Sequence, residues 1–554
     1  MEKKAQRAED KRRRREIRQS LADFGLSRGP RRLPGDAGAT DYEQARVQRL
    51  RAALESLGPP FSSFGLYMAT RVDLMRAQDC LELTAISERT APASPAEVEA
   101  LIGRELGCPP RDAFSEFEAA PFDSRPLSQT HRARLHDGQA VEVKVARPEL
   151  KRRLLAETEL LTLLSGAFAL GESEESVIED AASDFRRALL QDFTHEADAL
   201  INLSHDAEGV EMLRTPAVYR DLCSPNVLTV ERLEGSSLSR MIPPPDDAET
   251  GEAVPGASDG GYDLAHTLCL VWLRQSLLGR LFPVELRDEQ VVVISGKTIA
   301  YSGGSFASLS VAAKENLWGY LTAAARGDSD RACTHLLAEL EKGKARVSEE
   351  QLRHRLRQIV PFRDGGWSAR GGNDSLAEHL FLHWRIAGEL GFRPPSHLRA
   401  FYRGLFSTAA TARRLAGERD ALLEALGDVR VMAGMARLRE RLSPQELGEN
   451  SQRYAALFLE MPQSLDEALT LASGGEGRLK IRVSPDHGVR RRNNTPSVMI
   501  SLLVAAAAVA LLAHHVSASG MAGAWAERIG AIIFLLFGVL LLWASRGDKD
   551  ERQI

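Results

Sequence analysis

Two charged side chains, Lys144 and Glu196, are of types that could act together on a phosphate group. Valines at positions 141, 143 and 145 alternate with polar residues, which predicts a strand whose other face carries Lys144. Glu196 falls on the inward face of a predicted helix. The apolar residues that share this face by helical spacing are Phe185, Leu189, Phe193 and Leu200. Phosphoryl transfer from ATP needs a cation on the phosphates, and a glutamate can hold a lysine in that place. Spacing alone leaves a second interpretation open, in which Lys144 is an exposed strand lysine and Glu196 a solvated glutamate.

The elements that would position this pair form two short sheet regions set among helices. Residues 113–146 have the pattern of strand, loop and strand, with a hairpin turn at His136-Asp137-Gly138. Helices are predicted over about 149–206, strands return at 215–235, and a small hairpin is predicted around Gly296. The remainder, to about residue 475, is almost wholly helical in pattern. This order predicts a two-lobed α+β fold.

The composition of the 554-residue chain limits its class. Hydrophobic residues make up 44% and charged residues 27%, as in ordinary globular proteins, and the length indicates several structural units. A net charge of −5 gives no case for nucleic-acid binding. The five cysteines are scattered without a CxxC pair, which argues against zinc and redox motifs and fits a reducing compartment.

Composition and pattern also predict the domain boundaries. In chain order these are a basic disordered tail (1–40), a helical extension (41–112), a first lobe (113–235), a helical second lobe (236–475) and a basic linker (476–496). The tail has an alternative interpretation as a polybasic segment held near anionic lipid. The second lobe is predicted to carry a flexible insertion at 242–262, because this stretch is rich in proline, glycine and aspartate.

Two long charge-free runs, 497–513 and 529–544, follow the linker. Each spans roughly 25 Å as a helix, slightly short of a bilayer core of about 30 Å, so we expect helices at 497–516 and 525–545. The cations on the outer flanks of the pair are Arg482, Arg490, Arg491, Arg492, Arg546, Lys549 and Arg552. Such flanks predict a two-pass membrane hairpin with both termini in the cytoplasm. The alternative is a buried helical hairpin in a soluble core.

The order of segments resembles the UbiB/AarF family of atypical protein-kinase-like proteins, over roughly residues 55–420 and the terminal hairpin found in its bacterial members. The segments that match in order are 58–74, 121–135, 141–145, 192–203, 215–235 and 391–415. They look like the family's first signature helix, nucleotide loop, lysine strand, glutamate helix, the strand leading to the hinge, and a late helical segment. The resemblance implies a two-lobed protein-kinase-like fold, ATP and magnesium as cofactors, and a role in ubiquinone biosynthesis. It also favours an ion pair between Lys144 and Glu196.

Several family features are altered in this sequence. Where the family has Lys-x-Gly-Gln, residues 63–66 read Ser-Phe-Gly-Leu. In the nucleotide loop, Asp123 would repel phosphate and Pro126 lacks an N–H donor. Ser124 and Arg125 remain as candidate nucleotide-binding residues of this loop, because Arg125 could attract phosphate.

The catalytic loop departs further from the family. Residues 283–290, Pro-Val-Glu-Leu-Arg-Asp-Glu-Gln, stand in its place. Glu285 replaces the catalytic Asp and Gln290 the metal-binding Asn, so each functional atom moves by about 1.5 Å. Misplacement of that order can cost about 10²-fold in rate. Ser302 takes the place of the metal-binding Asp, and a neutral hydroxyl is a poor magnesium ligand. We therefore regard Glu285 and Gln290 as vestigial catalytic candidates and assign no metal ligand.

Three hypotheses follow. The first is a membrane-anchored UbiB/AarF-like pseudokinase of bacterial inner-membrane type, which binds or regulates near isoprenoid-quinone or lipid metabolism. Its expected partners are the lipid bilayer and an isoprenoid lipid or quinone-biosynthesis proteins. The second is an active atypical ATPase or kinase in which Glu285, Asp288 or Glu289 binds a displaced metal. The third is an unrelated membrane-tethered scaffold protein.

Overall fold

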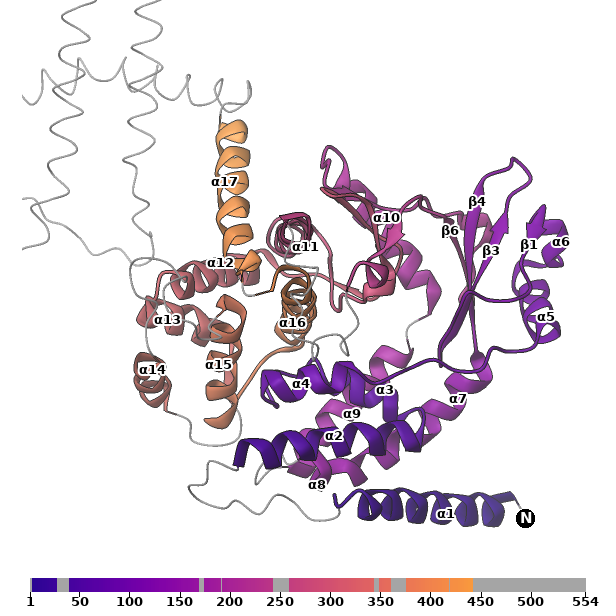
Figure 1. Cartoon of the computed structure of the whole chain (residues 1–554), viewed down its shortest axis with the longest axis horizontal. Coiled ribbons are helices and arrows are strands. Elements are labelled where there is room, and N and C mark those ends of the chain that lie inside the picture. Colours follow the sequence, from indigo (N-terminus) through magenta and orange to yellow (C-terminus); the bar gives the residue numbers. More distant parts are fainter. Residues whose placement is uncertain are drawn as a thin grey trace, which may run out of the picture. The chain divides into compact units, whose positions relative to one another are not determined.

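The computed structural model describes residues 2–26, 39–168, 174–190, 192–242, 259–342, 348–359, 375–417 and 419–441 (Figure 1). The chain divides into two compact units, Met1–Gly448 and Glu449–Ile554, and all described residues belong to the first. The basic linker and both predicted membrane helices, 497–516 and 525–545, lie outside the described residues. Within the described part, none of the helices is both long and apolar enough to cross a bilayer.

The N-terminal part is helical. Its helices are α1 (Glu2–Asp23), α2 (Ala39–Leu57), α3 (Phe61–Met68), α4 (Ala77–Thr84), α5 (Pro95–Leu106) and α6 (Pro110–Ala113). The prediction of a disordered tail is therefore wrong for residues 2–23. Ile17 and Leu21 lie one turn apart and are 0% and 5% exposed, because α1 packs on α2 and on the 3₁₀ segment Thr158–Leu164. This apolar contact outweighs the repulsion within the basic run.

A five-stranded sheet follows. Its strands are β1 (Glu116–Phe117), β2 (Asp123–Ser124), β3 (Ser128–Arg134), β4 (Ala140–Ala146) and β6 (Val227–Glu231). The order is β1-β3-β4-β6, with β2 also on β3. The predicted hairpin joins β3 and β4, and Gly138 adopts φ of 90°, which suits glycine. Lys144 pairs with Thr130 on one side and Leu228 on the other, so it is held in a central strand.

Helices connect β4 to β6 and cover part of this sheet. They are α7 (Pro148–Glu157), η1 (Thr158–Leu164), α8 (Ser165–Phe168), α9 (Glu174–Leu190) and α10 (Phe193–Ala207). The single predicted helix through Phe185 and Leu200 is in fact two helices, α9 and α10. The helical pattern is interrupted at Asp192, because its carboxylate accepts the Thr194 N–H at 3.0 Å and so caps the N-terminus of α10. Glu196 consequently lies in the first turn of α10.

A second sheet has the order β5-β10-β9-β7. Its strands are β5 (Leu213–Arg214), β7 (Ser236–Ser237), β9 (Val291–Ser295) and β10 (Thr298–Tyr301). The β9–β10 hairpin is the one predicted around Gly296. Two further short strands, β8 (Phe282–Pro283) and β11 (Phe306–Ala307), pair with each other and flank the β9–β10 hairpin in the sequence. The segments before β9 and after β10 correspond to the predicted catalytic and metal loops.

The C-terminal part of the described chain is helical. Its helices are α11 (Asp259–Leu277), α12 (Val311–Ala325), α13 (Ser329–Glu339), α14 (Glu349–Gln358), α15 (Leu376–Glu389), α16 (Ser396–Ala416) and α17 (Ala421–Arg441). α11 begins inside the predicted insertion 242–262, because Tyr262 is already packed in the core and is 8% exposed. Residues 243–258 of the predicted insertion lie outside the described part. The core here is aromatic, with Trp272, Phe282 and Phe401 in mutual ring contact.

One glycine in this core allows a close approach of two elements. A Cβ on Gly404 would lie 2.6 Å from the carbonyl oxygen of Pro283 and 2.8 Å from Trp272 Nε1. That indole N–H donates to the same carbonyl at 3.0 Å. We expect Gly404→Ala to lower the free energy of unfolding by about 1–3 kcal/mol in urea titration, because the helix cannot shift without breaking this contact.

The matched control is Gly427→Ala in α17, where an added Cβ meets nothing within 4 Å. Alanine should stabilise this helix by about 0.5–1 kcal/mol. Equal effects of the two substitutions would contradict the packing described for Gly404.

Candidate functional site

The structure brings Lys144 and Glu196 together across the first sheet and α10. Lys144 Nζ lies 2.8 Å from Oε2 and 3.0 Å from Oε1 of Glu196. The side chains are 23% and 10% exposed, so the pair is largely shielded from solvent. The ring of Phe193 lies 5.0 Å from Nζ and covers the lysine. The ion pair favoured by the sequence is thus present, and its role toward a nucleotide stays a prediction.

The loop after β10 closes on the same carboxylate. Oε1 of Glu196 accepts the backbone N–H of Gly304 at 2.8 Å. A Cβ on Gly303 would lie only 2.5 Å from Oε1, and Gly304 has φ of 128°, so both positions suit glycine. Glu196 therefore joins Lys144 of the first sheet to the segment that the sequence predicts as the metal loop.

Glu285 is bound by two arginines. Arg287 Nε lies 3.0 Å from its Oε1, and Arg403 Nη2 of α16 lies 3.3 Å from its Oε2. Burial by itself would raise the pKa of Glu285, but the charges of Arg287 and Arg403 outweigh it and lower that pKa. A carboxylate held ionised between two guanidinium groups is a weak base, which is unlike the residue that accepts a hydroxyl proton during phosphoryl transfer.

The same ion pairs continue to the helical extension and the nucleotide loop. Arg287 Nη1 contacts Glu88 Oε2 at 2.8 Å, and Glu88 is 8% exposed. Arg125 contacts Asp123 at 3.0 Å, Glu289 at 3.3 Å and the same Glu88 oxygen at 3.9 Å. The residues joined in this way are Glu88, Asp123, Arg125, Glu285, Arg287, Glu289 and Arg403. Because the charge of Arg125 is balanced by Asp123 and Glu289, this arginine is not a free cation for a phosphate.

Ser124 and Ser302 also contact protein groups through their side chains, and Gln290 does so through its backbone carbonyl. Ser124 Oγ lies 3.4 Å from Arg147 Nη1, which also donates to the carbonyl of Arg125 at 3.1 Å. Gln290 offers its backbone carbonyl to Ser302, which donates both its N–H at 2.9 Å and its hydroxyl at 3.2 Å. Ser302 therefore directs its hydroxyl proton to protein rather than presenting a charged oxygen.

This donor set does not fit a magnesium ion. Among the described residues there is no group of three His, Cys, Asp or Glu side chains arranged to hold a metal. Asp288, a candidate for a displaced ligand, contacts Thr411 at 3.0 Å and Arg414 at 2.6 Å. Glu289, the other such candidate, lies beside Arg125. Magnesium prefers carboxylate and water oxygens at short distance, and these carboxylates face arginines instead.

Sequence reasoning missed the partners of Glu285 and Arg125. Glu88 lies outside every matched segment, and Arg403 lies inside one without an assigned role. Arg287 is in the substituted catalytic loop, next to Glu285. The one local signal was the alternation of charges at 285, 287, 288 and 289, which indicates ion pairing without naming the partners.

The pair of Lys144 and Glu196 should contribute measurable coupling to stability. We expect a double-mutant cycle with Lys144→Ala and Glu196→Ala to give a coupling energy of about 1–3 kcal/mol in urea unfolding, because each single change leaves a shielded charge without its partner. The control cycle uses Arg134 and Glu116, a pair 3.4 Å apart whose side chains are 46% and 74% exposed. That coupling should stay below about 1 kcal/mol. A coupling at Lys144 no larger than the control would contradict this geometry.

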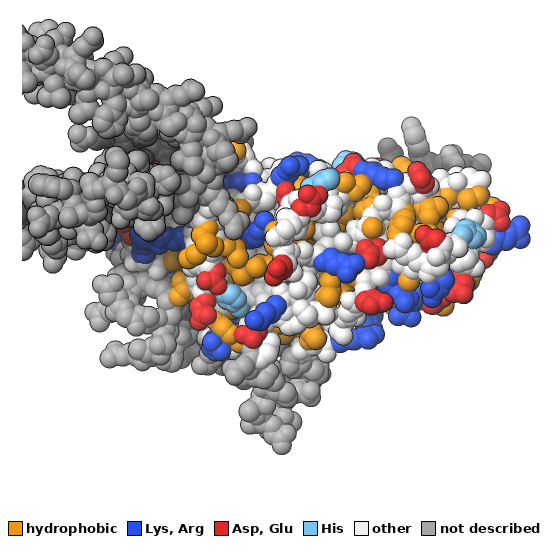
Figure 2. Space-filling view, turned by 90° about the horizontal axis from the view of Figure 1, so that it is seen from above, with side chains coloured by type: hydrophobic (Ala, Val, Ile, Leu, Met, Phe, Trp, Pro, Cys, Tyr) orange, Lys and Arg blue, Asp and Glu red, His pale blue; other side chains and the backbone are white. Residues whose placement is uncertain are grey.

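Acidic and basic side chains are interspersed on the face shown in Figure 2, with hydrophobic side chains between them. This mixture gives that face no field of a single sign, in keeping with the small net charge of −5.

Comparison with known proteins gives a family model, two curated relatives and a solved structure that are similar to parts of this chain. A protein-family model described as the ABC1 atypical kinase-like domain matches residues 85–248. The chain is 34% identical over 204 residues to a "Probable protein kinase UbiB" of Pseudomonas putida (strain GB-1), covering 36% of this chain and 38% of that protein. It is 36% identical over 197 residues to the protein of the same name from Azotobacter vinelandii, covering 35% and 37%. The match spans less than two fifths of the length of these relatives.

A solved structure, the complex of Rv3197 with erythromycin from Mycobacterium tuberculosis, is similar at 16% identity with a TM-score of 0.40. The similarity covers 77% of this chain and 97% of that chain.

The family match includes one part of the site and stops before the other. Residues 85–248 contain Glu88, Arg125, Lys144 and Glu196. Residues 283–304, with Glu285, Gln290 and Ser302, lie beyond the matched range. The family model therefore covers the lysine–glutamate pair and not the segments in which catalytic and metal-binding groups are expected.

Proposed function

Because this chain is a member of the UbiB/AarF family through its ABC1 atypical kinase-like domain, we propose that it is a membrane-anchored pseudokinase of that family. It has a kinase-like α+β fold, and it works by binding and regulation rather than by phosphoryl transfer. The interpretation as an unrelated scaffold protein is wrong, because the family model and the UbiB relatives match the chain.

The observation that carries this proposal is the state of Glu285. Its two oxygens contact Arg287 and Arg403, and Arg287 in turn contacts Glu88 of the helical extension. Phosphoryl transfer needs a residue that orients the acceptor and oxygens that hold magnesium. Glu285 instead binds arginines and the Ser302 hydroxyl donates to a backbone carbonyl, which supports a role in holding the lobes and the extension in one arrangement.

The second candidate function is an active ATPase or kinase with displaced metal ligands. The observation that favours it is the intact pair of Lys144 and Glu196, which is the arrangement that active kinases use on ATP phosphates. The candidates for displaced ligands, Asp288 and Glu289, would first have to leave Arg414 and Arg125. We therefore place this function second.

The membrane and quinone parts of the proposal rest on the sequence and the family. The charge-free runs 497–513 and 529–544 support an anchor with cytoplasmic termini. The family resemblance supports a site of action near isoprenoid-quinone metabolism. The binding partners in this proposal are the bilayer and an isoprenoid lipid or a quinone-biosynthesis protein.

Thermal unfolding of the purified full-length chain with nucleotide tests the proposal. We expect ATP to cause no magnesium-dependent rise in the unfolding midpoint. The candidate metal ligands Glu285, Asp288 and Glu289 are each paired with an arginine. The measurement compares ATP alone, ATP with magnesium, and magnesium alone, each for wild type and Lys144→Ala.

Lys144→Ala serves as the matched control, because it removes the cation that is predicted to act on the phosphates. A magnesium-dependent shift that disappears in Lys144→Ala would overturn the pseudokinase proposal and favour the active enzyme. A shift that persists in Lys144→Ala would report binding elsewhere and leave the proposal standing.

A further inference from the structure

Helix α1 carries a stripe of exposed cations. Lys11, Arg14, Arg15 and Arg18 are spaced i, i+3, i+4 and i+7, so they share one face over about 10 Å of helix. All four are exposed, and none forms an ion pair with a carboxylate whose side chain the structure describes. We call these four residues the α1 stripe. In the sequence the same spacing continues upstream through Arg7 and Lys4.

The opposite side of α1 is fixed to the body of the protein. Ile17 is fully buried, and Arg13 contacts Glu157 at 3.1 Å and the carbonyl of Leu57 at 2.8 Å. The guanidinium of Arg13 also lies 5.3 Å from the ring centre of Phe61. The apolar face of the helix is therefore occupied by its own protein, and the basic face points away from it.

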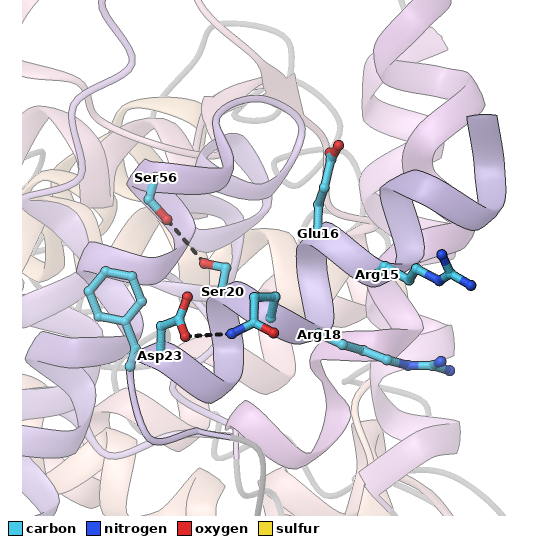
Figure 3. A pocket seen from close by; sticks show the side chains of 8 residues that line it. Arg15, Glu16, Arg18, Ser20, Asp23 and Ser56 are labelled. Carbon is cyan, nitrogen blue, oxygen red and sulfur yellow. Dashed lines mark hydrogen bonds between the residues drawn. The ribbon is translucent and has the colours of Figure 1, made fainter. Parts of the chain in front are cut away.

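Two residues of the stripe also line a shallow open pocket of about 830 Å³ between α1 and Ser56 of α2 (Figure 3). The acidic residues of this pocket already have partners. Glu16 contacts Arg12 and Arg13, each at 3.3 Å, and Asp23 accepts the Gln19 amide at 2.7 Å. Glu16 is balanced by Arg12 and Arg13, whereas Asp23 is bonded to a neutral amide and offsets only one of the two cations Arg15 and Arg18. The pocket therefore keeps a net positive charge, which favours an anionic occupant.

We propose that the α1 stripe docks on the anionic phospholipid headgroups of the membrane to which the chain is anchored. A rigid row of cations without an exposed apolar face fits a headgroup surface and excludes insertion into the acyl region. The choice of lipid over another polyanion rests on the proposed membrane location, since the cytoplasmic leaflet is negatively charged. Docking there sets the orientation of the extension relative to the bilayer.

The proposed binding is electrostatic, so the partition coefficient between vesicles and water depends on the number of cations in the stripe. Each cation near an anionic surface changes the partition coefficient by about fivefold, so loss of all four should lower it by on the order of 10³-fold. Because no apolar group enters the bilayer, raising the salt from about 50 to 300 mM should remove the binding, as the Debye length shortens.

The test separates the stripe from the C-terminal anchor. A chain ending at residue 448 keeps the whole compact unit that contains the described core, and thermal unfolding first establishes that it is folded. Flotation with vesicles of phosphatidylcholine, with and without 30 mol% phosphatidylglycerol, then measures partitioning. We expect binding only to the anionic vesicles, loss in K11Q/R14Q/R15Q/R18Q, and retention in R89Q/R186Q/R240Q/K297Q. The control removes the same charge from exposed positions scattered over the body.

Equal partitioning of wild type to neutral and anionic vesicles would overturn the proposal, as would equal loss in both quadruple variants. Binding to duplex DNA that depends on the stripe, without binding to anionic vesicles, would also overturn it in favour of a nucleic-acid partner. Failure of the C-terminal anchor is seen separately, as failure of the full-length quadruple variant to float with neutral vesicles at 300 mM salt.

Discussion

Replacing Glu285 by alanine should lower the free energy of unfolding by about 2–4 kcal/mol, because it leaves Arg287 and Arg403 in a shielded site without their shared carboxylate. Glu285 and Arg403 are 19% and 17% exposed, which places the expected loss near the lower part of the range for fully buried pairs. Urea unfolding of the two proteins at neutral pH measures it. The matched control is Glu289→Ala in the same loop, where the carboxylate is 50% exposed and the loss should stay below about 1 kcal/mol.

The loss of unfolding free energy in Glu285→Ala should also depend on pH. Burial opposes its ionisation, but Arg287 and Arg403 hold the pKa of Glu285 below the usual value. A carboxyl with a lowered pKa in the folded state stabilises above its unfolded pKa, about 4.3, and loses that contribution as the pH falls through its folded pKa. The difference between wild type and Glu285→Ala should therefore shrink below about pH 4. A difference that is constant from pH 7 to pH 3 would show that the charge of Glu285 is not the cause.

Asp73→Ala should cost about 3–5 kcal/mol, the largest effect that we expect from a single ion pair. Arg71 binds Asp73 through two of its guanidinium nitrogens, Nε and Nη2, at 2.8 Å each, and the side chains are 7% and 10% exposed. Alanine would leave the Arg71 charge buried. Arg71 also contacts the hydroxyl of Tyr67 at 3.4 Å, and the ring of Tyr67 lies 4.7 Å from the guanidinium carbon of Arg403. The loss should therefore loosen the helical extension where it meets α16.

The matched control is Asp79→Ala, which breaks a second bidentate pair in the same extension. Arg76 binds Asp79 at 2.8 and 2.7 Å, and its side chain is 31% exposed. Asp79 also lies in the first turn of α4, so we expect a loss of about 1 kcal/mol from the pair and the helix dipole together. Equal losses at Asp73 and Asp79 in urea unfolding would contradict the role of burial.

Local pattern was enough to predict several elements. Alternating valines and the turn at Asp137-Gly138 gave the β3–β4 hairpin and the position of Lys144. The spacing of Ser94 and Glu97 is typical of a capping box, and the structure contains both of its hydrogen bonds. The position of Glu196 was also inferred correctly, although the helix breaks at Asp192. That break has a local signal, because Asp192 followed by Phe193 and Thr194 is a typical N-cap sequence.

The rest of the site depends on contacts between distant parts of the chain. Glu88 and Arg287 are 199 residues apart, and Glu285 and Arg403 are 118 apart. The charge pattern of the sequence cannot identify such partners, because any carboxylate could pair with any guanidinium group until the fold is known. The basic tail was misjudged for a related reason: Ile17 and Leu21 have helical spacing, but only the presence of α2 and η1 gives them a surface to pack against.

The most direct test of the central claim is ATP turnover by the full-length protein in nanodiscs, followed as release of labelled γ-phosphate with magnesium. We predict that wild type and Lys144→Ala release phosphate at the same rate as nanodiscs without protein, because Glu285 is paired with Arg287 and Arg403 and Ser302 offers no charged oxygen to a metal. Magnesium-dependent turnover by wild type that is lost in Lys144→Ala would contradict the account.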